Sequence, residues 1–343
     1  MRKQKILIIF FFTLITNFIK AQEVYTYEKQ ISNLQNYIST EIETENTEDK
    51  VLLKGTLIEP KSTYTNVVII VPGSGKDTRN SHYRLTEKLL ENNIAVYRYD
   101  ERGCGLSTGK FNTISYTIND ITNDLKFVYL NIKNQKILTG KKIGLLGHSL
   151  GGMSTIGILD KSITPDFLIQ WATPVQKKGA FLKYQLTTGI NKFEEELIYN
   201  SLDEKLFVID KINTVIFENK NDENLVLCKK IDKVSNEIGY KKKNYKRFTY
   251  ANFLSTKELI KKDYEDNYKN CKIKLLYIIG ENDKFIDAKK ETELLESLKN
   301  PNIEIRKIEN LNHYLKNGIE NIESMYEIED NGVTEILNWI KMI

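Results

Sequence analysis

The sequence predicts an α/β fold, with a mostly parallel central sheet and helices on both of its faces. Between residues 67 and 172, short apolar runs typical of buried strands alternate with helical segments, and the alternation resumes at residue 271. Such alternation favours parallel strands joined by right-handed crossovers. A second observation is the stretch 142–159, where an apolar run passes through a glycine-rich turn into a helical segment. Because site residues gather at the carboxyl ends of parallel strands, we expect functional groups in the loops that follow them.

The elements of this core can be assigned in order along the chain. Residues 51–60 are an expected strand that stops at a proline, and Asn66–Val71 is apolar on both faces, as is typical of a strand in the middle of a covered sheet. The remaining elements are expected strands at 93–99, 142–146, 165–172, 271–279 and 302–308, and expected helices at 82–92, 116–133, 152–159, 287–299 and 332–342.

Residues 175–270 interrupt the alternation and predict a helical insertion. The stretch has no proline, three glycines and many Lys, Glu, Asn and Tyr residues. Its apolar residues fall at helical spacing, for example at Leu182, Leu186, Ile190, Phe193 and Leu197. We therefore expect a core formed by residues 22–174 and 271–343, and a helical cap over 175–270. The cap is expected to shield the core, to shape and close a substrate pocket, or to do both.

The first 21 residues predict a secretory signal peptide, and hence a secreted or periplasmic protein. Basic residues precede the apolar run Ile6–Ile15, which is too short to span a bilayer, and the small residue Ala21 follows. This segment contains four basic residues and no acidic one. Its removal would lower the number of basic residues from 50 to 46, which equals the 46 acidic residues of the chain. A neutral mature chain gives no reason to expect a nucleic-acid partner, and no stable membrane anchor is expected after cleavage.

The three cysteines are Cys104, Cys228 and Cys271, and they are widely spaced. They form neither a disulfide framework nor a metal-ligand cluster, although one bridge remains open on sequence grounds. We expect no metal and no cofactor, and the sequence leaves the oligomeric state open.

The turn Gly147–Gly151 has the spacing of a nucleophile elbow, with Ser149 at its centre. A serine on such a strained turn projects its hydroxyl above the sheet, and the flanking glycines avoid the collisions that side chains would cause there. The helix that follows begins with free backbone N–H groups, so the N–H of Leu150 can stabilise negative charge. The alternative is a glycine-rich turn whose serine has no catalytic role.

A serine hydroxyl needs a base to take its proton, and the chain has three histidines. His313 follows the last expected strand, and we predict it as the base. His148 precedes the serine on the turn, so it is expected to pack or to line the pocket. His82 starts a helix after the first glycine-rich loop and is expected at the surface.

A third residue must orient the imidazole and stabilise its charged form. Asp283 lies just after the expected strand 271–279, in a loop that holds two rivals, Glu281 and Asp287. We favour Asp283, because Ser149, Asp283, His313 is the chain order expected for a nucleophile on this kind of turn.

Two N–H donors are expected to hold the oxyanion that forms when the serine attacks a carbonyl group. Leu150 supplies one, and Ser74 in the glycine-rich loop Pro72–Gly75 supplies the other. This loop lacks the spacing of a phosphate-binding loop, so it gives little support to nucleotide binding.

Together these residues resemble the motifs of the α/β-hydrolase superfamily, most closely its serine aminopeptidase-like and esterase-type branches with a helical cap. The motifs lie at residues 71–75, 99–107, 147–152, 280–283 and 312–313, and the resemblance extends over roughly 50–343. It implies an eight-stranded, mostly parallel sheet, and it implies a supporting role for the loop Asp100–Arg102. Pro72 stands where many relatives carry histidine, a change that keeps the backbone donor of the loop.

The function predicted from these observations is a secreted serine hydrolase that cleaves a carboxylic ester, or an amide, through an acyl-enzyme. Its expected partner is a small-molecule ester or a short peptide. One alternative is an aminopeptidase of the same fold, with an acidic group from Glu194, Glu195 or Glu196 facing the substrate amine. A second alternative is a non-catalytic binding protein on the same scaffold.

Overall fold

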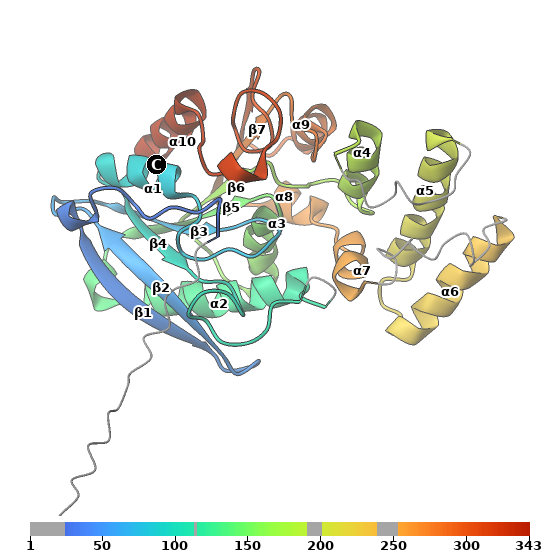
Figure 1. The fold of residues 1–343 in the computed structure, drawn as a ribbon, viewed down its shortest axis with the longest axis horizontal. Helices are drawn as coiled ribbons and strands as arrows, with labels where there is room; N and C mark the ends of the chain where they lie inside the picture. Colours follow the sequence, from blue (N-terminus) through green and yellow to red (C-terminus); the bar gives the residue numbers. More distant parts are fainter. Residues whose placement is uncertain (1–24, 113–114, 191–200, 239–252) are drawn as a thin grey trace, which may run out of the picture.

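The computed structural model describes residues 25–112, 115–190, 201–238 and 253–343, which form one α/β core and a helical insertion (Figure 1). The core is built on an eight-stranded sheet with the strand order β1-β2-β4-β3-β5-β6-β7-β8. Its strands are β1 (Ile38–Asn46), β2 (Val51–Glu59), β3 (Asn66–Val71), β4 (Ala95–Tyr99), β5 (Lys142–His148), β6 (Phe167–Trp171), β7 (Lys274–Gly280) and β8 (Ile303–Ile308). The strands from β4 to β8 in this order are parallel, whereas β2 runs antiparallel to both β1 and β4. The prediction of an eight-stranded, mostly parallel sheet is confirmed.

Helices cover both faces of this sheet, as the alternation of elements predicts. The core helices are α1 (Tyr83–Glu91), α2 (Ile118–Lys133), α3 (Leu150–Gly157), α9 (Ala288–Ser297) and α10 (Asp330–Met342). Short 3-10 turns lie at Leu34–Asn36, Lys136–Leu138, Ile158–Lys161 and Ile322–Ser324. Helices α1 and α10 pack together on one face, and α2 and α3 pack together on the other (Figure 1).

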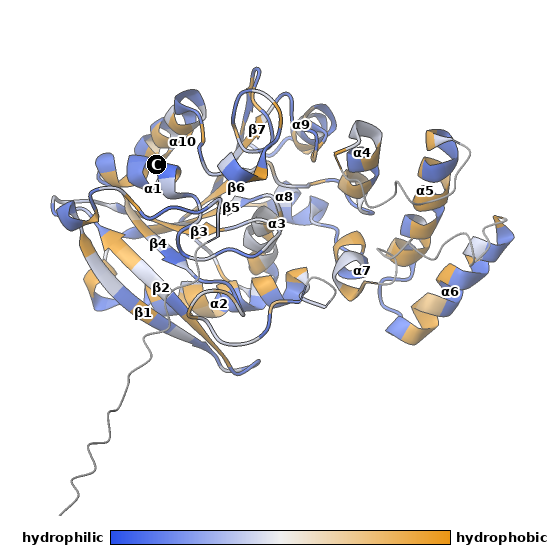
Figure 2. Cartoon of the chain, viewed as in Figure 1, coloured by the Kyte–Doolittle hydropathy of each residue, from blue (hydrophilic) through white to orange (hydrophobic). Residues whose placement is uncertain are grey.

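The middle of the sheet forms the hydrophobic core. Every residue of β3 from Val67 to Val71 is buried, which agrees with the expected central strand. Burial of one such side chain stabilises the fold by about 1.5–3 kcal/mol. Figure 2, coloured by hydropathy, shows hydrophobic strands inside and, around them, helices in which hydrophobic and hydrophilic residues alternate. This rigid sheet fixes the positions of the loops that follow its strands.

Between β6 and β7 the chain leaves the core and forms helices in the described parts of residues 175–270. These are α4 (Ala180–Thr188), α5 (Leu202–Glu218), α6 (Asn224–Glu237), α7 (Leu254–Ile260) and α8 (Glu265–Asn270). Helices α4 to α7 share a small apolar cluster separate from the main core, formed by Leu186, Val208, Ile209, Ile212, Ile216, Leu227, Ile231 and Ile260. Of the predicted apolar positions, Phe193 and Leu197 lie outside the described residues, as do residues 1–21.

Cys104, Cys228 and Cys271 are all free thiols, so the bridge that the sequence left open is not formed. Within the described ranges, no helix combines the length and the apolar character needed to cross a membrane.

Candidate active site

The serine singled out by the sequence lies at the sharp junction of β5 and α3. Ser149 has φ 53° and ψ −115°, a conformation that strains any residue with a side chain. Only glycine fits at the two flanking positions, because a Cβ there would collide with the backbone. A Cβ on Gly147 would lie 2.5 Å from the carbonyl oxygen of Gly151, and a Cβ on Gly151 would lie 2.2 Å from that of Val71. The turn therefore has the predicted elbow geometry.

Asp283 and His313 come together behind this turn, from the loops after β7 and β8. The Nδ1 atom of His313 lies 2.7 Å from Oδ2 of Asp283, and both side chains are buried. The other oxygen, Oδ1, accepts backbone N–H bonds from Phe285 at 2.7 Å and Ile286 at 2.8 Å. The carboxylate is thus held from two sides, and with Nδ1 donating to it, Nε2 of His313 is the ring nitrogen available as a base.

Two side chains hold the loop that carries His313 by hydrogen bonds to its main chain. Trp171, at the end of β6, donates its indole N–H to the carbonyl oxygen of His313 at 3.1 Å. The side-chain oxygen of Asn312 accepts from the backbone N–H groups of Tyr314 at 3.0 Å and Lys316 at 3.1 Å. These bonds hold the imidazole in one place relative to the end of the sheet.

A cavity of about 820 Å³ opens at this end of the sheet. Ser149 and His313 line it, together with the predicted oxyanion residues Ser74 and Leu150. Apolar side chains form much of the remaining wall, including Met153, Phe181, Leu182, Phe285 and Ile322. The structure therefore brings four of the five predicted site residues to one cavity and places Asp283 directly behind His313.

The geometry at the predicted oxyanion donors is compatible with their role. Leu150 is the first residue of α3, where backbone N–H groups have no acceptor within the helix and the helix dipole favours negative charge. Ser74 follows Gly73, and a Cβ on Gly73 would lie only 3.4 Å from Cβ of Ser149. The two donors thus flank the serine from separate elements.

The expectation that His82 lies at the surface is wrong, because only 1% of this residue is exposed. Its Nε2 atom lies 3.2 Å from Nδ1 of His148, and its ring packs 4.2 Å from the ring of Tyr326. The sequence prediction failed because the loop before α1 folds inward, against the residue that precedes Ser149. His148 is buried and lines the cavity, which agrees with the role predicted for it.

Burial keeps these two histidines neutral. It lowers the pKa of His82 to about 3, and it lowers the pKa of His148 well below its ordinary value, with the nearby His313 adding to the effect. Neutral neighbours add no positive charge beside His313 when His313 takes up a proton.

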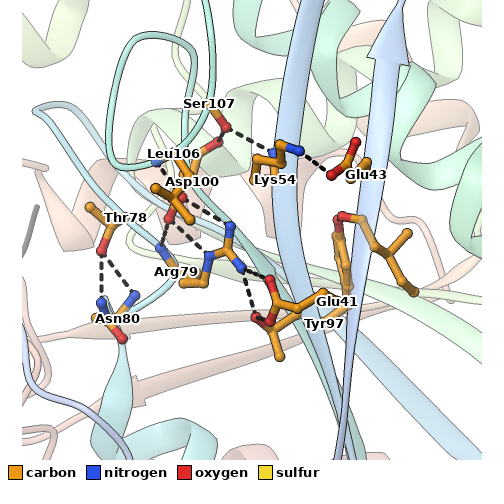
Figure 3. A network of polar contacts seen from close by, with 12 residues as sticks. Glu41, Glu43, Lys54, Thr78, Arg79, Asn80, Tyr97, Asp100, Leu106 and Ser107 are labelled. Carbon is orange, nitrogen blue, oxygen red and sulfur yellow. Dashed lines mark hydrogen bonds and ion pairs between the residues drawn. The ribbon is translucent and has the colours of Figure 1, made fainter. Parts of the chain in front are cut away.

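Arg79 ties the first glycine-rich loop to the second (Figure 3). Its guanidinium contacts the buried carboxylate of Asp100 at 3.0 and 3.1 Å, and its backbone N–H donates to the same carboxylate at 2.8 Å. Asp100 also accepts from the backbone N–H of Leu106 at 2.8 Å, and Arg79 pairs with Glu41 of β1. This network agrees with the supporting role implied for the loop Asp100–Arg102.

Residues 25–29 also belong to the site, although no sequence pattern indicates this. We call this segment the N-terminal strap. Glu28 is buried, and its carboxylate accepts from the backbone N–H of Thr78 at 2.6 Å and from the Thr78 hydroxyl at 2.7 Å. Tyr27 lines the cavity and donates its hydroxyl to the carbonyl oxygen of Lys76. The partners lie about fifty residues apart in the chain, so no local pattern could reveal them.

The insertion reaches the site through α4. Tyr184 donates its hydroxyl to the backbone oxygen of Asp283 at 3.0 Å, and Thr188 donates to that of Lys284 at 2.7 Å. At the start of the insertion, buried Glu291 accepts from the N–H groups of Val175 at 3.0 Å and Gln176 at 2.9 Å. Burial raises the pKa of Glu291 to about 7. The insertion is thus attached both to the loop of Asp283 and to the core.

This fold, with a serine elbow and an acid–histidine pair in the loops of a mostly parallel sheet, is that of the α/β hydrolases. A family model described as "Serine aminopeptidase, S33" matches residues 63–320, and the chain belongs to this family. An esterase from Pyrococcus furiosus has a similar structure, with 19% sequence identity, a TM-score of 0.58, and coverage of 94% of this chain and 96% of the esterase. An esterase from Exiguobacterium antarcticum is similar at 14% identity and a TM-score of 0.54, covering 88% of this chain and 100% of the other. A search of curated protein sequences found no match.

Proposed function

We propose that this hydrolase cleaves carboxylic esters through an acyl-enzyme formed on Ser149. The observation that supports this best is the Asp283–His313 contact of 2.7 Å, because it orients an imidazole at the cavity in which the strained serine lies. A serine on an elbow with an oriented base nearby is the arrangement that activates a hydroxyl nucleophile.

In the proposed reaction, the Ser149 oxygen attacks the ester carbonyl carbon while Nε2 of His313 takes the hydroxyl proton. The N–H groups of Ser74 and Leu150 hold the negative oxygen of the tetrahedral intermediate. His313 then returns the proton to the leaving alcohol oxygen, and the bond between carbon and that oxygen breaks. A water molecule, deprotonated by His313, attacks the acyl-enzyme and releases the acid together with free Ser149.

The walls of the cavity favour an apolar ester as the substrate. Apolar side chains such as Phe181, Leu182 and Met153 surround the reacting groups, and α4 of the insertion supplies two of these three. We propose that the helices of 175–270 act as the cap of the enzyme and determine its substrate range.

We also propose that residues 1–21 direct the protein out of the cytoplasm, so that it meets its substrate as a secreted or periplasmic enzyme.

An aminopeptidase is the second candidate, because the matching family model carries that description. It requires an acidic group that faces the substrate amine. Glu194, Glu195 and Glu196, the candidates from the sequence, lie outside the described residues.

The test is hydrolysis of p-nitrophenyl esters from acetate to decanoate, beside aminoacyl p-nitroanilides, by the wild type and by Ser149→Ala. We expect ester turnover that is lost in the variant. Anilide turnover in place of ester turnover would establish the peptidase. Folded protein that turns over neither series and does not react with a fluorophosphonate probe would refute the catalytic proposal and favour a binding protein.

A further inference from the structure

The residues proposed to hold the oxyanion line two cavities of different size. The larger one, of about 820 Å³, holds Ser149 and His313. A smaller one, of about 180 Å³, borders the same oxyanion loop, and Ser74 and Leu150 line both cavities. A carbonyl group bound by these two donors therefore lies next to both cavities.

The chemistry of the proposed reaction assigns the two sides. His313 must deliver a proton to the leaving oxygen, so the alcohol part of an ester has to lie on the side of His313. His313 lines the larger cavity and is absent from the described walls of the smaller one. The acyl part leaves the carbonyl carbon in another direction, and the smaller cavity, which shares Ser74 and Leu150 with the larger one, offers it space beside the oxyanion donors.

We propose that the smaller cavity is the acyl site, and that the enzyme acts on esters of a compact, neutral, apolar acid with a larger apolar alcohol. This inference rests on the proposed esterase function and adds to it the substrate class and its orientation. A cavity of about 150 Å³ lined by apolar side chains holds a benzene molecule. The 180 Å³ available here is therefore suited to short, branched or aromatic acyl groups.

The walls of the acyl site are set by the start of α2. Ile118 and Ile121 are buried on this helix and line the cavity. Thr117 caps the helix together with Asp120, each side chain bonding the backbone N–H of the other, which fixes where α2 begins. Before the helix, the ring of Phe111 packs against that of Tyr116, 5.2 Å away, and both rings line the cavity.

Glu101 is the carboxyl group among the described residues that line this cavity. It is buried, and its Oε2 atom accepts from the backbone N–H of Asp77 at 3.1 Å. Burial and the nearby Asp77 raise the pKa of Glu101 well above its ordinary value, so a neutral carboxyl group faces the bound acyl group. An acyl group with its own charge would find no charged partner in this wall, which supports a preference for neutral acids.

The first experiment compares two isomeric esters, octyl butyrate and butyl octanoate, which differ only in the direction of the ester group. We expect the wild type to hydrolyse octyl butyrate with a kcat/KM at least about tenfold higher. Equal or reversed preference, with both activities lost in Ser149→Ala, would overturn the acyl-site assignment and leave the esterase function standing. Absence of hydrolysis for both esters and for the p-nitrophenyl series would instead refute the esterase function.

A pair of variants tests the position of the acyl site. Phe111→Ala enlarges the smaller cavity, and Ile322→Ala, at an exposed position, enlarges the larger one. Phe111→Ala is expected to raise the ratio of p-nitrophenyl octanoate to butyrate turnover by about tenfold. Ile322→Ala is expected to leave this ratio unchanged and to alter the ranking of butyrate esters with different alcohols. An acyl ratio that responds to Ile322→Ala and not to Phe111→Ala would assign the cavities the other way round.

Discussion

Replacing Asp283 by Asn tests whether the carboxylate controls the tautomer of His313. The Asp283 oxygen Oδ1 accepts two backbone N–H bonds, from Phe285 and Ile286. An asparagine has one acceptor oxygen, and these two donors fix where that oxygen lies. Its NH₂ group must then face Nδ1 of His313, which lies 2.7 Å from the other oxygen, Oδ2.

A donor in that position forces Nδ1 of His313 to accept and places the proton on Nε2, the atom proposed as the base. In serine proteases the same exchange lowers kcat by about 10,000-fold because the histidine has the wrong tautomer. This loss corresponds to about 5.5 kcal/mol of transition-state stabilisation. We expect a loss of this size in Asp283→Asn, with KM changed much less.

The assay is p-nitrophenyl butyrate hydrolysis, with circular dichroism and thermal melting to establish that the variant folds. Asp287→Asn is the matched control, because Asp287 is a rival from the same loop that caps α9 through a bond to the N–H of Lys290. Asparagine caps helices as well as aspartate does, so this control should keep nearly full activity. A folded Asp283→Asn enzyme that loses less than about tenfold would refute the reasoning about the tautomer.

Three further predictions concern the supports of the site. Gly151→Ala places a Cβ 2.2 Å from the Val71 carbonyl oxygen, so we expect a loss of at least about 1–3 kcal/mol in unfolding free energy; an unchanged melting temperature would contradict this. Tyr184→Phe removes a hydrogen bond to the Asp283 backbone worth about 1 kcal/mol, so kcat should fall about fivefold at unchanged KM; equal kcat values would show that α4 does not position the acid loop. Burial raises the pKa of Glu291 to about 7 in the folded protein, from 4.5 in the unfolded chain. The protonated carboxyl group therefore adds to the free energy of unfolding below about pH 4.5, and this contribution is lost as the pH rises through 7. Chemical denaturation between pH 5 and pH 8 should show this loss, roughly 3 kcal/mol, in the wild type, and a flatter profile in Glu291→Gln; parallel profiles would exclude Glu291 as the cause.

The core of the fold could be predicted because its signals are local. A buried strand such as Asn66–Val71 needs a continuous apolar run, and its position in the middle of the sheet follows from having no polar face. Ser149 was predictable for the same reason, since its turn needs glycines at fixed positions to avoid the collisions measured at Gly147 and Gly151. Steric requirements of this kind appear directly in the order of residues.

His82 shows where such reasoning ends. A histidine before a helix is usually solvated, and its burial follows from contacts with His148 and Tyr326, which lie in distant parts of the sequence. Glu28 and Glu291 belong to the same group, because each becomes buried by accepting backbone N–H bonds from a segment far along the chain. Polar partners at long separation leave no periodicity that a sequence pattern could capture.

The N-terminal strap has a consequence for the order in which the site can be completed during synthesis. Tyr27 lines the cavity near the start of the chain, and its ring meets Tyr326, 6.1 Å away, near the end. Lys29 pairs with Glu327 at 2.7 Å, so the N-terminal strap and residues 326–327 meet beside the cavity. A ribosome must therefore release the chain as far as Glu327 before this wall can close, and a nascent chain that already contains Ser149 still lacks a finished substrate cavity.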